Sequence, residues 1–178
     1  MYALTKSPAD CPDQPAYVEL EFDRGTPTAI NGVEMSLLDL IASLGTLAGA
    51  HGVGRIDMVE NRLVGIKSRE VYEAPAAVVL HAAHHELRKL VTTRDLDRLC
   101  RYVSLQYADL VYNGLWFTPM REAYDAFVGQ IQPKVTGVCR LKFFKGGCHV
   151  VARQSPFALY DRESVLAPPD PRTASLLY

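Results

Sequence analysis

Apolar and polar residues alternate near both ends of this chain, and that period of two is typical of strands with one buried face. Residues 17–22 read YVELEF. A turn at Asp23-Arg24-Gly25 then leads to a short strand at 28–30, and Asn31-Gly32 is a strong hairpin signal. Near the other end, VTGVCRLKFF and CHVVARQS alternate on either side of Lys145-Gly146-Gly147. The pattern therefore predicts antiparallel hairpins at both ends of the chain.

Between these hairpins the apolar positions recur at helical spacing. Ser36 is expected to cap a first helix, with Asp39 at the third position. Further helices are predicted at 76–91, from 94 to about 112 behind a Thr92 or Thr93 cap, and from Pro119 to about 131. In the first helix we expect a buried stripe of Leu37, Leu38, Ile41, Leu44 and Leu47 or Ala48. In the helix predicted from 94 to about 112, the inner face is expected to contain Leu96, Leu99, Val103, Tyr107, Leu110 and Val111. The fold class is α+β, with antiparallel strand hairpins packed against three to four helices.

Residues 51–75 mix charged side chains with apolar ones and three glycines, and the alternation from Ile56 to Val64 is strand-like with an irregular polar patch in the middle. Buried charges must pair, because an isolated buried charge costs several kcal/mol or more. These side chains must therefore pair with one another, face water or face a ligand. Glu60 and Tyr72 carry the ligand interpretation, since a carboxylate anchors ammonium or ureido N–H groups and a phenol adds one directional hydroxyl. The alternative is a solvated salt-bridge patch at a strand end, which is the commoner arrangement of such residues.

Composition indicates one soluble domain: 178 residues, 48% hydrophobic, with a net charge of −1. The absence of a basic excess argues against nucleic acid, and no apolar run approaches the roughly 20 residues of a membrane helix. The first residues contain no apolar signal segment, and the four cysteines show no CxxC pairing. We therefore expect reduced thiols, no membrane association and a cytoplasmic location.

His81, His84 and His85 lie at helical spacing and invite a metal hypothesis. The HExxH arrangement of zinc peptidases places Glu directly after the first His, whereas an alanine follows His81 here. We expect structural or surface histidines and no metal site.

The segment GVGRIDMVENRLVGIKSREVYEAP resembles a segment in the second domain of argininosuccinate synthases. LVYNGLWFTPMREA and RLKFFKGGCHVVARQSPFALYD are similar to two further elements of that family, so the resemblance covers residues 1–165, a partial synthetase/multimerisation domain. Residues 166–178 are then a divergent or disordered tail. The resemblance implies that Glu60 and Tyr72 contact citrulline. Glu70 stands where the family usually has glycine, which adds a negative charge and would strain the backbone if that position needs positive φ.

The family joins L-citrulline to L-aspartate with ATP and releases AMP and pyrophosphate, using an SGGLDTS-type loop that cradles phosphate. This sequence contains no such loop. The resemblance therefore implies a C-terminal part of the enzyme that contributes to the citrulline pocket, contains no catalytic residue and is inactive alone. ATP and Mg would bind to an N-terminal half, which is the expected partner, and the complete enzyme would be a homo-oligomer. The alternatives are a non-catalytic amino-acid-binding module and a truncated structural remnant.

Overall fold

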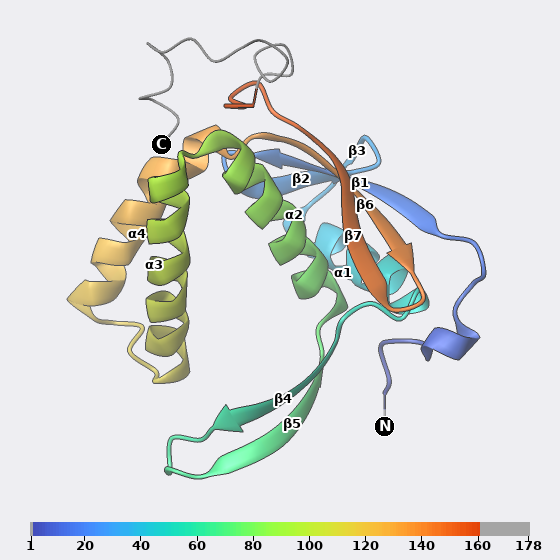
Figure 1. Cartoon of the computed structure of the whole chain (residues 1–178), viewed down its shortest axis with the longest axis horizontal. Coiled ribbons are helices and arrows are strands. Elements are labelled where there is room, and N and C mark those ends of the chain that lie inside the picture. The colour runs from blue at the N-terminus through green and yellow to red at the C-terminus, as the bar shows by residue number, and fades with distance from the viewer. Residues whose placement is uncertain (1, 161–178) are drawn as a thin grey trace, which may run out of the picture.

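A five-stranded antiparallel sheet lies at the centre of the molecule (Figure 1). The computed structural model describes residues 2–160, so the predicted tail at 166–178 lies outside the described residues. The strands occur in the order β3-β2-β1-β6-β7, which brings the two ends of the described chain together as the neighbours β1 and β6. Their bounds are β1 Ala16–Asp23, β2 Thr26–Ile30, β3 Val33–Glu34, β6 Gly137–Phe144 and β7 Gly147–Gln154.

Three two-residue turns connect the neighbouring strands of this sheet, and both residues of each turn have positive φ. Such turns match the right-handed twist of the strands they join. The second residue is glycine each time, which adopts positive φ without a steric penalty. The turns are Arg24-Gly25, Asn31-Gly32 and Lys145-Gly146. The predicted hairpins, and with them the α+β class, are confirmed.

Two helices, α1 (Leu37–Ala50) and α2 (Pro75–Val91), pack with the sheet around the core. Alternate residues of the two central strands are buried, whereas their neighbours are exposed, as the period of two predicts. The buried strand residues are Val18, Leu20, Phe22, Cys139, Leu141 and Phe143. The helix α1 begins at the predicted cap, where the Asp39 amide donates to Ser36 Oγ and the Ser36 hydroxyl donates to the Asp39 carboxylate.

The predicted buried stripe of α1 is wrong in part. Leu44 is buried, and of the alternatives Leu47 and Ala48 it is Ala48 that is buried, but Leu37, Leu38 and Ile41 are 42–77% exposed. The row in contact with the core is Leu40, Leu44 and Ala48, spaced four residues apart. Since α1 packs only along β2 and α2, one narrow row is enough to cover the contact, and the wider apolar face remains outside.

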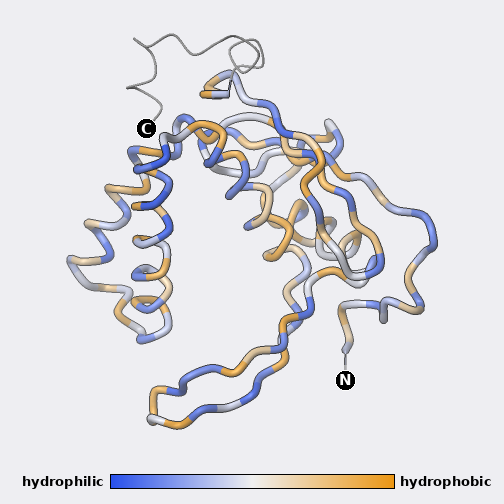
Figure 2. The backbone as a smooth tube through the Cα atoms, viewed as in Figure 1, coloured by the Kyte–Doolittle hydropathy of each residue, from blue (hydrophilic) through white to orange (hydrophobic). Residues whose placement is uncertain are grey.

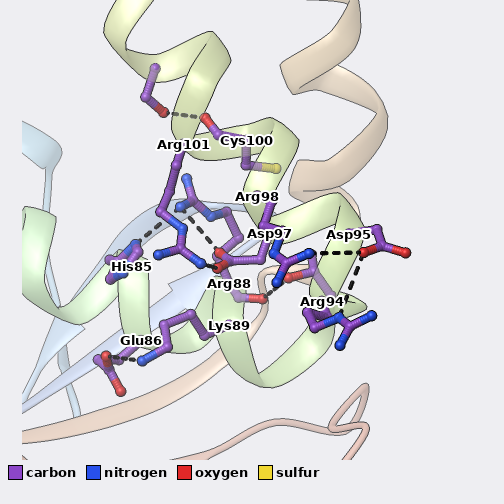
Figure 3. A network of polar contacts seen from close by, with 12 residues as sticks. His85, Glu86, Arg88, Lys89, Arg94, Asp95, Asp97, Arg98, Cys100 and Arg101 are labelled. Atoms are coloured by element: carbon purple, nitrogen blue, oxygen red, sulfur yellow. Dashed lines mark hydrogen bonds and ion pairs between the residues drawn. The ribbon is translucent and has the colours of Figure 1, made fainter. Parts of the chain in front are cut away.

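The helices α3 (Arg94–Tyr112) and α4 (Pro119–Ile131) form a pair beside α2, on the side away from the sheet (Figure 1). Val103 and Leu110 are buried as predicted, whereas Leu99 and Val111 are about half exposed. Asp97 and Cys100 are buried instead. Asp97 lies between Arg88 of α2 and Arg101 of its own helix, at 3.4 and 2.8 Å (Figure 3). A buried ion pair therefore joins α3 to α2.

The strands β4 (Arg55–Asn61) and β5 (Lys67–Glu73) form a separate two-stranded hairpin that projects away from the sheet (Figure 1). Two short 3-10 turns, Pro8–Asp10 and Gln132–Lys134, complete the described chain. No helix within residues 2–160 is long and apolar enough to cross a membrane. The four cysteines are free thiols.

Candidate functional site

The candidate site is built on the β4–β5 hairpin, whose strands pair in unbroken register from Arg55–Glu73 to Asn61–Lys67. Gly65, at φ +83°, allows the chain to reverse, and the Arg62 amide donates to the Ile66 carbonyl at 2.8 Å. At the base, the Ala74 amide donates to Gly54 O, and a Cβ at Gly54 would lie 2.3 Å from Pro75 Cα. The base and the turn of the hairpin thus both depend on glycine.

Directly paired residues in an antiparallel hairpin share a face, so the register divides the side chains into two sets. Glu60 pairs with Ser68, Met58 with Glu70, and Ile56 with Tyr72, and these six lie on one face. We call this the Glu60 face. The residues on the other face include Asp57 and Arg69. The register therefore places both predicted ligand-binding residues, Glu60 and Tyr72, on the same face.

The Glu60 carboxylate is the centre of that face. Tyr72 Oη donates to Glu60 Oε2 at 2.9 Å, and Arg62 Nη1 donates to Glu60 Oε1 at 2.7 Å. Arg62 Nη2 also lies 3.5 Å from Glu70 Oε1. The hydrogen bond to Glu60 raises the pKa of the Tyr72 hydroxyl. The same carboxylate, followed by the charge of Glu70, raises the pKa of the Arg62 guanidinium. Two carboxylates thus share one guanidinium.

The Glu60 side chain is only 12% exposed, although Arg62 is 45% exposed. Each carboxylate oxygen accepts more than one hydrogen bond, so the contacts to Tyr72 and Arg62 leave acceptor capacity for a ligand N–H. The fixed geometry lowers the cost of ordering this group when a ligand arrives. Ser68 Oγ, on the residue opposite Glu60, is buried and has no hydrogen-bond partner within residues 2–160.

Glu70 does not strain the backbone. The residues other than glycine with positive φ in the described chain are Arg24, Asn31 and Lys145, so Glu70 has ordinary strand geometry. The family usually has glycine at this position, but the backbone strain that Glu70 would cause at positive φ is absent. The added charge remains, and it is held beside Arg62.

The sequence also allowed these charged residues to form a solvated salt-bridge patch. A salt bridge of this kind is present on the opposite face of the hairpin. Arg69 contacts both oxygens of Asp57, at 2.8 and 2.5 Å, and Lys67 Nζ donates to Asn61 Oδ1 at 2.8 Å. The Arg69 hydrogen bond lowers the pKa of Asp57. The charges of Asp57 and Arg69 balance one to one, in contrast to those of the Glu60 face.

Contacts at both ends support the hairpin. Tyr112 Oη, at the end of α3, donates to the Asn61 carbonyl at 3.1 Å, directly beside Glu60. At the base, the Glu73 carboxylate accepts the Thr5 hydroxyl and the amides of Ala3, Leu4 and Thr5. The sequence offered no signal for Tyr112, which lies 51 residues from Asn61. Glu70 reaches the site because the hairpin brings it beside Arg62.

The three histidines lie elsewhere. His84 Nε2 lies 3.0 Å from Gln132 Oε1, and His85 Nδ1 lies 3.0 Å from Arg88. Burial lowers the pKa of His84 and of His85. Within residues 2–160 no group of three His, Cys, Asp or Glu side chains could hold a metal ion. His81 and His84 line a mainly apolar cavity of about 640 Å³ among α2, α3 and α4, which meets the hairpin only through Tyr112.

Comparison with known proteins identifies the family of this chain. The family pattern described as "Arginosuccinate synthase C-terminal domain" matches residues 1–169. The chain is 56% identical over 160 residues to argininosuccinate synthase of Acaryochloris marina, covering 90% of this chain and 40% of the relative. It is 52% identical over 162 residues to that of Pelodictyon phaeoclathratiforme, covering 91% and 40%. It is 50% identical over 173 residues to that of Rubrobacter xylanophilus, covering 97% and 42%.

The chain therefore spans about 40% of the length of these relatives. The match to the family covers nearly the whole chain, which includes the hairpin that contains Glu60 and Tyr72. The chain belongs to the argininosuccinate synthase family and corresponds to its C-terminal part.

Proposed function

We propose that this chain supplies part of the citrulline pocket of an argininosuccinate synthase, which ligates L-citrulline and L-aspartate with ATP and releases AMP and pyrophosphate. The observation that carries the proposal is the contact of Tyr72 with Glu60 on the hairpin, at 2.9 Å. Family membership supports it, since the complete relatives are named argininosuccinate synthases.

In this proposal the chain positions the substrate and leaves the chemistry to another part of the enzyme. Glu60 accepts N–H groups of citrulline, Tyr72 fixes the direction of the carboxylate, and Arg62 holds its second oxygen. Holding one reactant in a fixed orientation lowers the barrier of the step in which the ureido oxygen attacks the α-phosphorus of ATP. The catalytic groups for that attack lie outside this chain.

The residues of this chain do not fit ATP and Mg. Its only double glycine is Gly146-Gly147, in the turn between β6 and β7, and the Gly146 amide already donates to the His51 carbonyl at 2.7 Å. A phosphate cradle needs several free amides and a nearby metal. ATP and Mg therefore belong to an N-terminal half, which is the proposed partner, in a cytoplasmic homo-oligomer without nucleic-acid or membrane partners.

Titration of the full 178-residue chain with L-citrulline, followed by NMR, tests the pocket. We expect Glu60→Gln to weaken binding by about 1.5–3 kcal/mol, the range for a hydrogen bond to a charged group. Asp57→Asn is the matched control, because it also removes one carboxylate from β4 but on the opposite face. Equal affinities of the wild type and Glu60→Gln would remove Glu60 from the site. No citrulline binding to the wild type would favour a structural remnant, whereas binding without activity in any complex would favour a non-catalytic amino-acid-binding module.

A further inference from the structure

The charges on the Glu60 face do not balance. Arg62 is 2.7 Å from Glu60 and 3.5 Å from Glu70, and it is the one cation among these three side chains. Tyr72 contributes a hydroxyl proton without a charge. The group of Glu60, Arg62, Glu70 and Tyr72, which we call the Glu60 cluster, therefore has a net charge of −1.

The proposed function indicates which end of citrulline this cluster would hold. If the proposed function is correct, the ureido group must reach ATP, and ATP belongs to another part of the enzyme because this chain offers no phosphate cradle. The end of citrulline that remains for the hairpin is the α-amino acid end, which has an ammonium group. A net negative cluster complements an ammonium better than it complements a neutral ureido group.

We propose that Glu70 is a specificity-determining residue that strengthens the preference of this site for ligands with an α-ammonium group. This inference rests on the proposed function and adds to it the part of the ligand that is recognised. By sharing Arg62, Glu70 leaves part of the negative charge of Glu60 uncompensated. A ligand ammonium then supplies the missing positive charge. Without Glu70, Arg62 would neutralise Glu60 alone, and the preference of the site for a cationic group would be weaker.

The opposite face of the same hairpin provides the control. Asp57 and Arg69 form a balanced pair, with both carboxylate oxygens within 2.8 Å of the guanidinium. Asp57→Asn changes the charge of the hairpin by the same amount as Glu70→Gln, but it does so away from the Glu60 cluster. A general effect of net charge on ligand binding would appear in both variants, whereas a specific effect would appear only in Glu70→Gln.

The test compares two ligands that differ only in the α-ammonium group: L-citrulline and 5-ureidopentanoic acid. Each is titrated by NMR into the full chain as wild type, Glu70→Gln, Glu70→Asp and Asp57→Asn. We expect the wild type to prefer citrulline, and Glu70→Gln to reduce this preference about two- to fivefold, the range for a partly exposed charge pair. Glu70→Asp should retain part of the preference, and Asp57→Asn should leave it unchanged.

A citrulline preference that is the same in Glu70→Gln as in the wild type would overturn the inference and leave the proposed function intact. An equal loss of preference in Asp57→Asn would also overturn it, because the effect would then follow net charge alone. Failure of the wild type to bind citrulline would overturn the proposed function, and the inference with it.

Discussion

The Tyr72 hydroxyl has one proton, and it donates that proton to Glu60 Oε2. Tyr72 is paired across the hairpin with Ile56, near the base. Removing only the oxygen therefore tests the hydrogen bond without removing the ring. The contact fixes one oxygen of the carboxylate, while Arg62 fixes the other.

We expect Tyr72→Phe to weaken citrulline binding by about 0.5–1.5 kcal/mol, because one hydrogen bond is lost while Arg62 still holds Glu60. NMR titration of the full chain measures this change. Tyr102→Phe, at an exposed position on α3, is the control and should leave binding unchanged. An affinity for citrulline in Tyr72→Phe equal to that of the wild type would exclude a role for the hydroxyl.

Glu60 and Tyr72 could be chosen from the sequence because a long motif surrounds both of them. The contact of Arg62 with Glu70 could not be assigned, because the hairpin turn brings these two residues together. The alternation predicted a strand only up to Val64, so the strand β5 was not predicted. Its residues Lys67 to Glu70 are four consecutive polar side chains without the alternation that marks a half-buried strand.

At the scale of elements, the position of the site hairpin depends on Glu73. Its carboxylate accepts the Thr5 hydroxyl at 2.5 Å and the Ala3 amide at 2.7 Å, and Arg55 Nε donates to Thr5 Oγ1 at 2.8 Å. The Arg55 guanidinium also lies 3.7 Å from the centre of the Tyr2 ring. The hydrogen bonds, that from the Thr5 hydroxyl first, lower the pKa of Glu73 from an ordinary value of 4.5 to about 2.

This lowered pKa predicts how the anchor responds to pH. A carboxyl with a lower pKa in the folded chain stabilises it above pH 4.5, and this contribution is lost as the pH falls through about 2. The amide signals of Ala3, Leu4 and Thr5 in NMR spectra should therefore titrate with a midpoint near 2 and lose this titration in Glu73→Gln. A midpoint near 4.5 would show that the carboxylate is free of these donors.

The buried pair of Asp97 and Arg88 makes a prediction about the α2–α3 junction (Figure 3). Asp97→Asn leaves Arg88 buried without its ion-pair partner, and we expect the free energy of unfolding to fall by about 3 kcal/mol. Asp95→Asn is the control, because Asp95 is exposed on the same helix; its loss should cost less than about 0.5 kcal/mol. Urea unfolding measures both. Equal losses in the two variants would mean that burial of Asp97 has no special effect.

The partly wrong prediction of the buried stripe of α1 also concerns a single element. Periodicity predicts that a helix is amphipathic, but it does not say how wide a strip its neighbours cover. Ser36 and Asp39 were predicted correctly because a helix cap depends only on residues next to one another in sequence. The orientation of α1 depends on its packing against β2 and α2, which the periodicity of α1 itself does not contain.

At the scale of the whole molecule, apolar side chains remain exposed beyond the core. Figure 2 shows hydrophobic residues at the turn of the β4–β5 hairpin, where Leu63, Val64 and Ile66 are exposed. Phe117, between α3 and α4, is 94% exposed. Trp116, beside it in the chain, is 46% exposed. Exposed apolar groups of this size are typical of interaction surfaces, which agrees with a chain that spans about 40% of its relatives.

Pyrophosphate release is the most direct test of the account. The full chain is mixed with a separately produced N-terminal half of a family relative, together with ATP, citrulline and aspartate. We predict release only when both parts are present, with a strong reduction in Glu60→Gln and wild-type rates in Asp57→Asn. If the two parts associate and the N-terminal half binds ATP, yet no pyrophosphate is released, or release is equally fast in Glu60→Gln, the proposed role of this chain is contradicted.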